Sequence, residues 1–64
     1  MPMITVDWLE GRSAEQRQAL SRAITDAFVQ IAKVSKEQVW IKFHDVPRSH
    51  WAVSGDVLDQ GKKS

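Results

Sequence analysis

The chain has no cysteine, and this absence removes the usual covalent support of a short sequence. A chain of 64 residues buries little surface by itself, so domains of this size commonly rely on disulfides, a metal or oligomerisation. Disulfides and thiolate metal sites are excluded, and two histidines without cysteine do not suit a structural zinc site. We therefore expect a single domain over residues 1–64 that gains further buried surface by forming a homo-oligomer.

A strong net charge is also missing, because basic and acidic residues nearly balance at +1. The basic residues are scattered, which disfavours nucleic acid as a partner. No apolar run is long enough to cross a membrane, and the amino terminus lacks the basic and apolar stretches of a secretory signal. Yet 42% of the residues are apolar, more than is typical of a disordered chain. The expectation is a folded cytoplasmic protein that binds neither nucleic acid nor membrane.

Apolar periodicity predicts a strand, a helix and a second strand in that order. Residues 3–9 alternate between apolar and polar side chains, and β-branched residues are frequent there, as in a strand. Ser13 and Gln16 form a capping-box pattern that begins an amphipathic helix, which ends near Lys33. Residues 39–44 alternate again and are predicted as the second strand. Short links between these elements predict a parallel strand pair joined by a right-handed crossover.

The remaining residues predict a small addition to this unit. A loop follows over residues 46–49, and the apolar run 51–53 precedes a turn signal at 54–56, which fits a short hairpin or edge strand. Residues 59–64 are polar and are expected to form a flexible tail. The predicted fold class is therefore α/β (α+β), with one βαβ unit and a short C-terminal hairpin. Because a two-stranded sheet is marginal alone and its edges are exposed, the pattern again favours assembly.

Pro2 is the first candidate for chemistry. Aminopeptidases remove an initiator methionine before a small residue, and removal of Met1 would leave Pro2 with a secondary amine. Apolar surroundings or a neighbouring guanidinium lower the pKa of such an amine toward neutral, where a general base works best. A Met-Pro start is by itself accidental in most proteins. Here Pro2 leads directly into the predicted strand 3–9, which would hold the amine in a fixed place.

Arg12 is the second candidate, because it follows Gly11 at the expected start of the helix. A guanidinium there can bind a carboxylate through two parallel hydrogen bonds, and the helix amino end favours an anion. A solvated surface arginine is nevertheless the commoner fate of a lone residue of this type. Trp40 and Trp51 suit the walls of an apolar pocket or, more commonly, core and interface packing. Other charged or titratable residues are interpreted as surface or turn groups: Asp7, Glu10, Arg17, Arg22, His44, Asp45, Arg48, His50 and Asp56.

With Pro2, the segment Leu9–Ser13 and the pair Glu15-Gln16 considered together, the chain resembles the 4-oxalocrotonate tautomerase family. The segment His50–Gly55 is similar to a His-aromatic-small-aliphatic-small-Gly segment of that family, so the resemblance covers most of the chain. It implies a small βαβ subunit, typically assembled as a hexamer, with active sites at subunit contacts. It also implies that the protein needs no metal or cofactor.

The resemblance implies a role for each matching residue. Pro2 would take a proton from the hydroxyl of an enol or dienol and return it to carbon. Arg12 would bind the substrate carboxylate. Leu9 and Trp51 would supply apolar walls that keep the amine poorly hydrated. The implied activity is keto–enol tautomerisation of a small-molecule 2-keto acid.

Trp40 departs from the family pattern, because the best-known members have a second arginine at this point of the second strand. A tryptophan cannot neutralise an anion, so an aryl enolpyruvate fits Trp40 better than a dicarboxylate such as 2-hydroxymuconate. Lys42 or Arg48 could replace the missing cation. Two alternatives stay open at this point. One is another reaction of the same superfamily, such as a hydration-type dehalogenation or a decarboxylation, and the other is a non-enzymatic oligomeric module.

Overall fold

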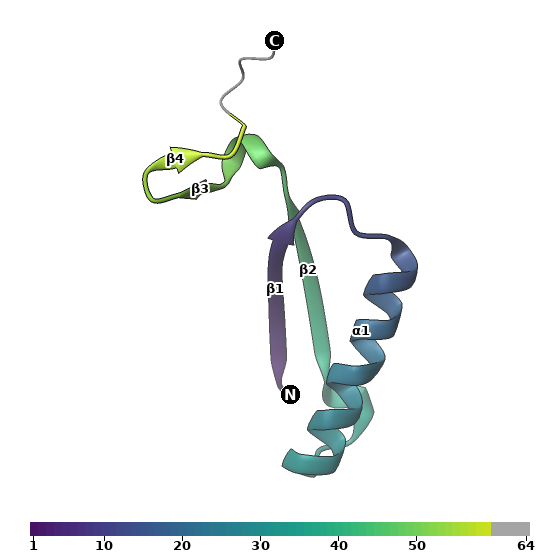
Figure 1. Cartoon of the computed structure of the whole chain (residues 1–64). Helices are drawn as coiled ribbons and strands as arrows, with labels where there is room; N and C mark the ends of the chain where they lie inside the picture. The colour runs from purple at the N-terminus through teal and green to yellow at the C-terminus, as the bar shows by residue number, and fades with distance from the viewer. Residues whose placement is uncertain (60–64) are drawn as a thin grey trace.

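A computed structural model describes residues 1–59 and contains the predicted βαβ unit (Figure 1). Strand β1, Met3–Leu9, pairs in parallel with β2, Trp40–Val46, in a register that runs from Met3 opposite Trp40 to Leu9 opposite Val46. The first strand has the predicted bounds. The second is shifted from the predicted 39–44, because Val39 donates its N–H to Lys36 and closes the preceding turn. That turn is the 3₁₀ helix η2, Lys36–Gln38.

The helix begins where its capping residues predict. Gln16 donates its backbone N–H to Ser13 Oγ at 3.1 Å, and the Ser13 N–H donates to Gln16 Oε1 at 2.9 Å. These bonds start α1, Ala14–Ala27, which continues as the π-helical turn η1, Phe28–Ala32. Lys33 then turns the chain with a φ of 61°. The predicted end near Lys33 is confirmed, whereas the change from α to π geometry was not predicted.

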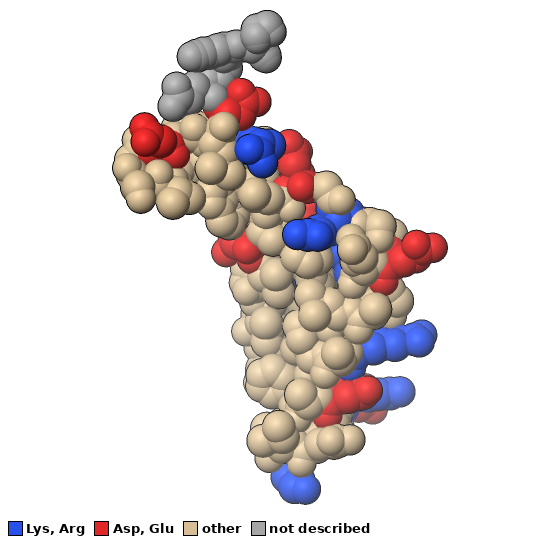
Figure 2. Space-filling model, in the orientation of Figure 1, with Lys and Arg blue, Asp and Glu red and all other residues tan. Residues whose placement is uncertain are grey.

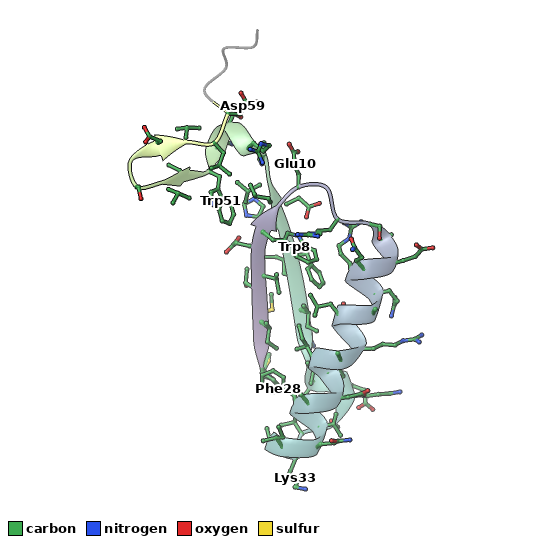
Figure 3. The ribbon with its side chains drawn as sticks, in the orientation of Figure 1. Trp8, Glu10, Phe28, Lys33, Trp51 and Asp59 are labelled. Carbon is green, nitrogen blue, oxygen red and sulfur yellow. The ribbon has the colours of Figure 1, made fainter. Side chains whose placement is uncertain are left out.

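The β1–β2 sheet has two unlike faces. Alternate side chains are half-buried on one face, where Trp8 stacks on Phe43 with ring centroids 5.1 Å apart. This face lies toward α1, as the side chains in Figure 3 show. Met3 and Trp40 lie on the other face and are 52% and 59% exposed. The sheet is therefore covered on one side only.

A short hairpin follows the sheet, as predicted. The 3₁₀ turn η3, Arg48–His50, leads into β3, Ala52–Val53, which pairs antiparallel with β4, Asp56–Val57. The connecting turn places Ser54 and Gly55 at positive φ, 57° and 88°, the conformation that glycine adopts most readily. In Figure 1 the hairpin projects from the end of the sheet that lies farther from the amino terminus.

Asp59, the first residue of the expected tail 59–64, has a backbone hydrogen bond to the rest of the chain, and the flexibility of the tail stays a prediction. Asp59 donates its backbone N–H to the Arg48 carbonyl at 3.3 Å, and Leu58 donates to the Trp51 carbonyl at 2.8 Å. These two bonds connect the end of the hairpin to η3 and to Trp51, which follows η3. The rest of the predicted flexible tail, residues 60–64, lies outside the described residues.

A single copy does not enclose a core. Among residues 1–59 none is buried, and the Cα radius of gyration is 15.6 Å. A compact chain of this length would have a radius of about 11 Å. Figure 2 shows Lys and Arg side chains projecting along the outer side of α1, while much of the surface over the strands is uncharged. Large apolar side chains remain exposed: Met1, Met3, Ile31, Trp40, Val53 and Leu58.

Within residues 1–59, none of the helices has both the length and the apolar character that a membrane span requires.

Candidate active site

Pro2 and Trp40 lie together at the amino-terminal end of the sheet. The Trp40 N–H donates to the Pro2 carbonyl at 3.0 Å, one step before the first paired residues of the parallel ladder. Pro2 is half-buried, whereas the Trp40 side chain is largely exposed. With Met1 present, the Pro2 nitrogen belongs to a peptide bond and is not basic. Removal of Met1 would convert it to a secondary amine at a place that the ladder fixes.

The surroundings of this end are apolar. An open depression of about 180 Å³ is lined by Ala27, Phe28, Ile31 and Ala32 at the end of α1 and in η1. Because the helix returns the chain from one end of the sheet to the other, this depression lies at the same end as the amino terminus (Figures 1 and 3). Ile31 is 80% exposed, so a single copy leaves this apolar surface in contact with water.

Leu9, Arg12 and Trp51 lie at the opposite, carboxyl-terminal end of the sheet. Leu9 is the last residue of β1, and the turn after it places Gly11 at a φ of 112° before Arg12. The Arg12 guanidinium carbon lies 5.9 Å from the centroid of the Trp8 ring. Trp51 follows η3 and is half-buried, and Figure 3 shows Trp8 and Trp51 at this end of the strands, far from Phe28.

One chain therefore separates the predicted catalytic and substrate-binding residues. Pro2 precedes β1 and Arg12 follows it, and a strand of seven residues rises by roughly 20 Å between them. We call Pro2 and Trp40 the Pro2 half-site, and Leu9, Arg12 and Trp51 the Arg12 half-site. A small substrate cannot touch both half-sites of the same copy.

The two predicted replacements for the missing arginine also lie at different ends. Lys42 follows Trp40 by two residues in β2, so its side chain is on the same exposed face and near the Pro2 half-site. Arg48 lies in η3, beside the hairpin and the Arg12 half-site. Within one copy, Lys42 is thus the cation closer to Trp40.

Asp45 is exposed, as expected, but it also has two partners that the sequence did not indicate. Its Oδ1 accepts a hydrogen bond of 2.6 Å from Trp8 Nε1. Its Oδ2 lies 3.6 Å from Arg17 Nη1. The predicted strand stopped at His44, whereas the extension of β2 to Val46 places Asp45 opposite Trp8 in the register. Had the second strand been predicted to continue to Val46, its parallel pairing with the first strand would have placed Asp45 opposite Trp8.

A second polar pair lies on the exposed face of the sheet. His44 Nδ1 is 3.2 Å from Asp7 Oδ1, and both side chains are largely exposed. The two residues are opposite each other in the register. Within residues 1–59, the contacts of His44 and Asp7 do not include a residue of either half-site.

Comparison with known proteins gives consistent results. A family model described as tautomerase enzyme matches residues 2–61. A probable tautomerase of Streptococcus pyogenes serotype M3 is 37% identical over 57 residues, which cover 89% of this chain and 93% of the relative. The crystal structure of YwhB, a homologue of 4-oxalocrotonate tautomerase, has a TM-score of 0.86 and 31% identity, over 95% of this chain and 100% of that one. A heterohexamer 4-oxalocrotonate tautomerase from Chloroflexus aurantiacus has a TM-score of 0.84 and 32% identity, over 97% and 100%.

These matches extend over nearly the whole of both chains in each comparison. The βαβ fold with its short hairpin is thereby confirmed as that of the structures named as tautomerase homologues.

Proposed function

Because the chain belongs to the tautomerase family, we propose that it catalyses keto–enol tautomerisation of a 2-keto acid with Pro2 as the proton-transferring base. The observation that carries this proposal is the hydrogen bond from Trp40 to the Pro2 carbonyl, which fixes the first residue after Met1 at the head of a strand. A catalytic amine needs such a fixed position, because proton transfer requires the donor and acceptor to be within hydrogen-bond reach.

The proposed reaction moves one proton and leaves the electron count unchanged. The Pro2 amine removes the hydroxyl proton of the enol, the oxygen becomes a carbonyl, and the proton on Pro2 is returned to carbon. Apolar surroundings and a nearby guanidinium both disfavour the ammonium form, so they lower the pKa of the amine toward the working pH. Arg12 binds the substrate carboxylate, while Leu9 and Trp51 form apolar walls. This chemistry needs no metal or cofactor.

The proposed site combines the Pro2 half-site of one copy with the Arg12 half-site of another. The separation of the half-sites within a chain supports this, as does the lack of buried residues in the described part of a single copy. The relative from Chloroflexus aurantiacus is a heterohexamer. For this chain we favour a homohexamer, built from copies of the one domain that residues 1–64 are expected to form.

Trp40 defines the proposed substrate class. Its exposed indole beside Pro2 suits an aryl group better than a second carboxylate, so a monocarboxylate such as phenylenolpyruvate is favoured over 2-hydroxymuconate. Lys42 supplies a cation on the same face and gives some tolerance for a polar substrate end. No observation within residues 1–59 specifically favours dehalogenation, decarboxylation or a non-enzymatic module.

The test begins with mass spectrometry of the purified protein, which should show that Met1 is absent. An ultraviolet assay with phenylenolpyruvate then compares Pro2→Ala and Arg12→Ala with the parent protein. We expect Pro2→Ala to lower kcat by about 100-fold. Arg12→Ala should raise KM by at least about tenfold, because a charged hydrogen-bonding partner of the carboxylate is lost.

The matched control is Arg22→Ala, which removes an exposed guanidinium from the helix and should leave both constants unchanged. Full turnover by Pro2→Ala would refute the assignment of Pro2 as the base. A stable monomer in light scattering, with full activity, would refute a site shared between copies.

A further inference from the structure

The segment that bears Arg12 is held by two contacts, one to its backbone and one to its side chain. Arg17 Nη1 donates to the backbone carbonyl of Arg12 at 3.1 Å. The Trp8 ring lies under the Arg12 guanidinium, 5.9 Å from its carbon atom, a distance at which the ring face attracts a cation. Residue Arg12 itself follows Gly11, whose positive φ lets the chain turn but does not fix the turn. These two contacts are therefore what orient the exposed arginine.

Both contacts end on the same carboxylate. Asp45 Oδ1 accepts from Trp8 Nε1 at 2.6 Å, and Asp45 Oδ2 faces Arg17 Nη1 at 3.6 Å. Each oxygen thus holds one of the two groups that touch Arg12. The Arg17 nitrogen that faces Asp45 is the same nitrogen that donates to the Arg12 carbonyl. We call Asp45, Trp8 and Arg17 the Asp45 clamp. Asp45 lies in β2, inside the parallel ladder, so the Asp45 clamp is anchored to the β1–β2 sheet.

Asp45 leaves the guanidinium of Arg12 available for an anion. In the part of the chain from Met1 to Asp59, no carboxylate forms an ion pair with Arg12, because the nearby acid is paired with Arg17. A substrate carboxylate can therefore use the planar fork of Arg12 without first displacing an internal partner. An arrangement in which Asp45 paired with Arg12 directly would weaken such binding.

We propose that Asp45 is a positioning residue, which orients Arg12 toward the substrate carboxylate through Trp8 and Arg17. This inference rests on the proposed carboxylate-binding role of Arg12. Arg12 binds the carboxylate in the ground state and the transition state alike, so loss of its orientation acts on KM and spares kcat. A residue that only stabilised the fold would lower the amount of active protein and would leave KM unchanged.

The experiment measures kcat and KM for phenylenolpyruvate with the complete, processed protein. Asp45→Asn keeps an oxygen for the Trp8 indole but removes the charge that attracts Arg17. We expect it to raise KM by about fivefold, with kcat within about twofold of the parent. Trp8→Phe keeps an aromatic ring but removes the indole N–H together with one ring of the indole, and KM should rise by a smaller factor of about two. Asp26→Asn, a neutralised exposed acid on α1, is the matched control and should leave KM unchanged.

The double variant Asp45→Asn with Arg12→Ala identifies the route of the effect. If Asp45 acts through Arg12, its substitution should not raise KM further once Arg12 is absent, because effects in one network are not additive. An equal rise of KM in both backgrounds would overturn the positioning role, as would an unchanged KM in Asp45→Asn. Should Asp45→Asn fail to assemble in light scattering, Trp8→Phe is measured instead, with Arg12 present and with Arg12→Ala. An equal rise of KM in both cases would again overturn the inference.

The two proposals fail in different ways. If Arg12→Ala leaves KM unchanged, the carboxylate-binding role of Arg12 is wrong and the positioning role of Asp45 falls with it. If Arg12→Ala raises KM while Asp45→Asn does not, Arg12 keeps its role and only the inference about Asp45 is overturned.

Discussion

The two ends of the β1–β2 sheet hold their candidate residues by different means. At the amino-terminal end, Pro2 is fixed by one backbone hydrogen bond to Trp40, and the surfaces around it are apolar and exposed. At the carboxyl-terminal end, Arg12 is surrounded by a network of side chains from the same copy, Trp8, Arg17 and Asp45. In the proposed function another copy completes the first arrangement, whereas the contacts of the second come from one chain.

This difference indicates that contacts between copies would stabilise the Pro2 half-site, whereas contacts within one chain stabilise the Arg12 half-site. Apolar side chains around the Pro2 half-site gain free energy when another copy covers them, at about 25 cal/mol per Å² of apolar surface removed from water. Charged side chains around the Arg12 half-site would be costly to bury unless paired, and Arg17 and Asp45 are already partners. Substitutions at the two ends should therefore differ in kind as well as in size.

The largest effect is expected from blocking the amine of Pro2. An amino-terminal extension that replaces free Pro2 with a peptide-bonded Pro2 removes the basic nitrogen and leaves the remaining sequence unchanged. We expect kcat for phenylenolpyruvate to fall by about a thousandfold, within the range that a general base contributes. Proteolytic removal of the extension to expose Pro2 is the control and should restore turnover. Retained activity with the extension in place would show that the base lies elsewhere.

The next effect tests whether the two ends meet across copies. Pro2→Ala and Arg12→Ala are each expected to be impaired, but a mixed oligomer contains sites with an intact Pro2 from one copy and an intact Arg12 from another. Unfolding and refolding an equal mixture should restore about a quarter of the parent kcat/KM by random association of copies. The separately refolded variants are the control. If both half-sites came from one chain, mixing would restore nothing.

The sequence was sufficient for features that depend on neighbouring residues. The alternation over residues 3–9 and the reciprocal bonds of Ser13 with Gln16 are local, so β1 and the start of α1 were predicted with the observed bounds. The hairpin was also predicted, because its turn residues lie next to one another. The resemblance to the family was visible for the same reason, since the segment Leu9–Ser13 is continuous.

The sequence did not predict contacts that depend on the register of the two strands and on the packing of the helix. Asp45 lies 37 positions from Trp8, and their contact follows only from the parallel pairing that places them opposite each other. Arg17 appeared to be an ordinary surface cation until the helix brought it to Asp45. Pro2 and Arg12 flank the predicted strand 3–9, so their separation along β1 could be predicted, whereas the contacts that hold Arg12 could not. Contacts of this kind are set by the fold and not by residue type.

A smaller effect is expected when the missing cation is returned to the Pro2 half-site. Trp40→Arg replaces an exposed indole with a guanidinium beside Pro2. We expect the ratio of kcat/KM for 2-hydroxymuconate to that for phenylenolpyruvate to rise by about tenfold, since a charged hydrogen bond is gained and an aromatic contact is lost. Gln18→Arg adds the same charge on the outer side of α1 and should leave the ratio unchanged. An unchanged ratio in Trp40→Arg would remove Trp40 from the set of specificity residues.

The smallest effect concerns the cap that starts α1 immediately after Arg12. Ser13→Ala removes the acceptor for the Gln16 N–H and should lower the free energy of unfolding by about 1 kcal/mol, measured by chemical denaturation at one fixed protein concentration. Ser21→Ala is the matched control, because the Ser21 hydroxyl only returns a bond to the Arg17 carbonyl within the helix and alanine is a better helix former. KM of the Ser13→Ala and Ser21→Ala variants also tests what orients Arg12 at the carboxyl-terminal end of the sheet. Asp45 lies in β2 and Trp8 in β1, so their contacts do not depend on the cap, whereas Arg17 lies in the first turns of α1. KM should therefore rise less in Ser13→Ala than in Asp45→Asn, and an equal rise would mean that the helix start, and not Asp45, orients Arg12.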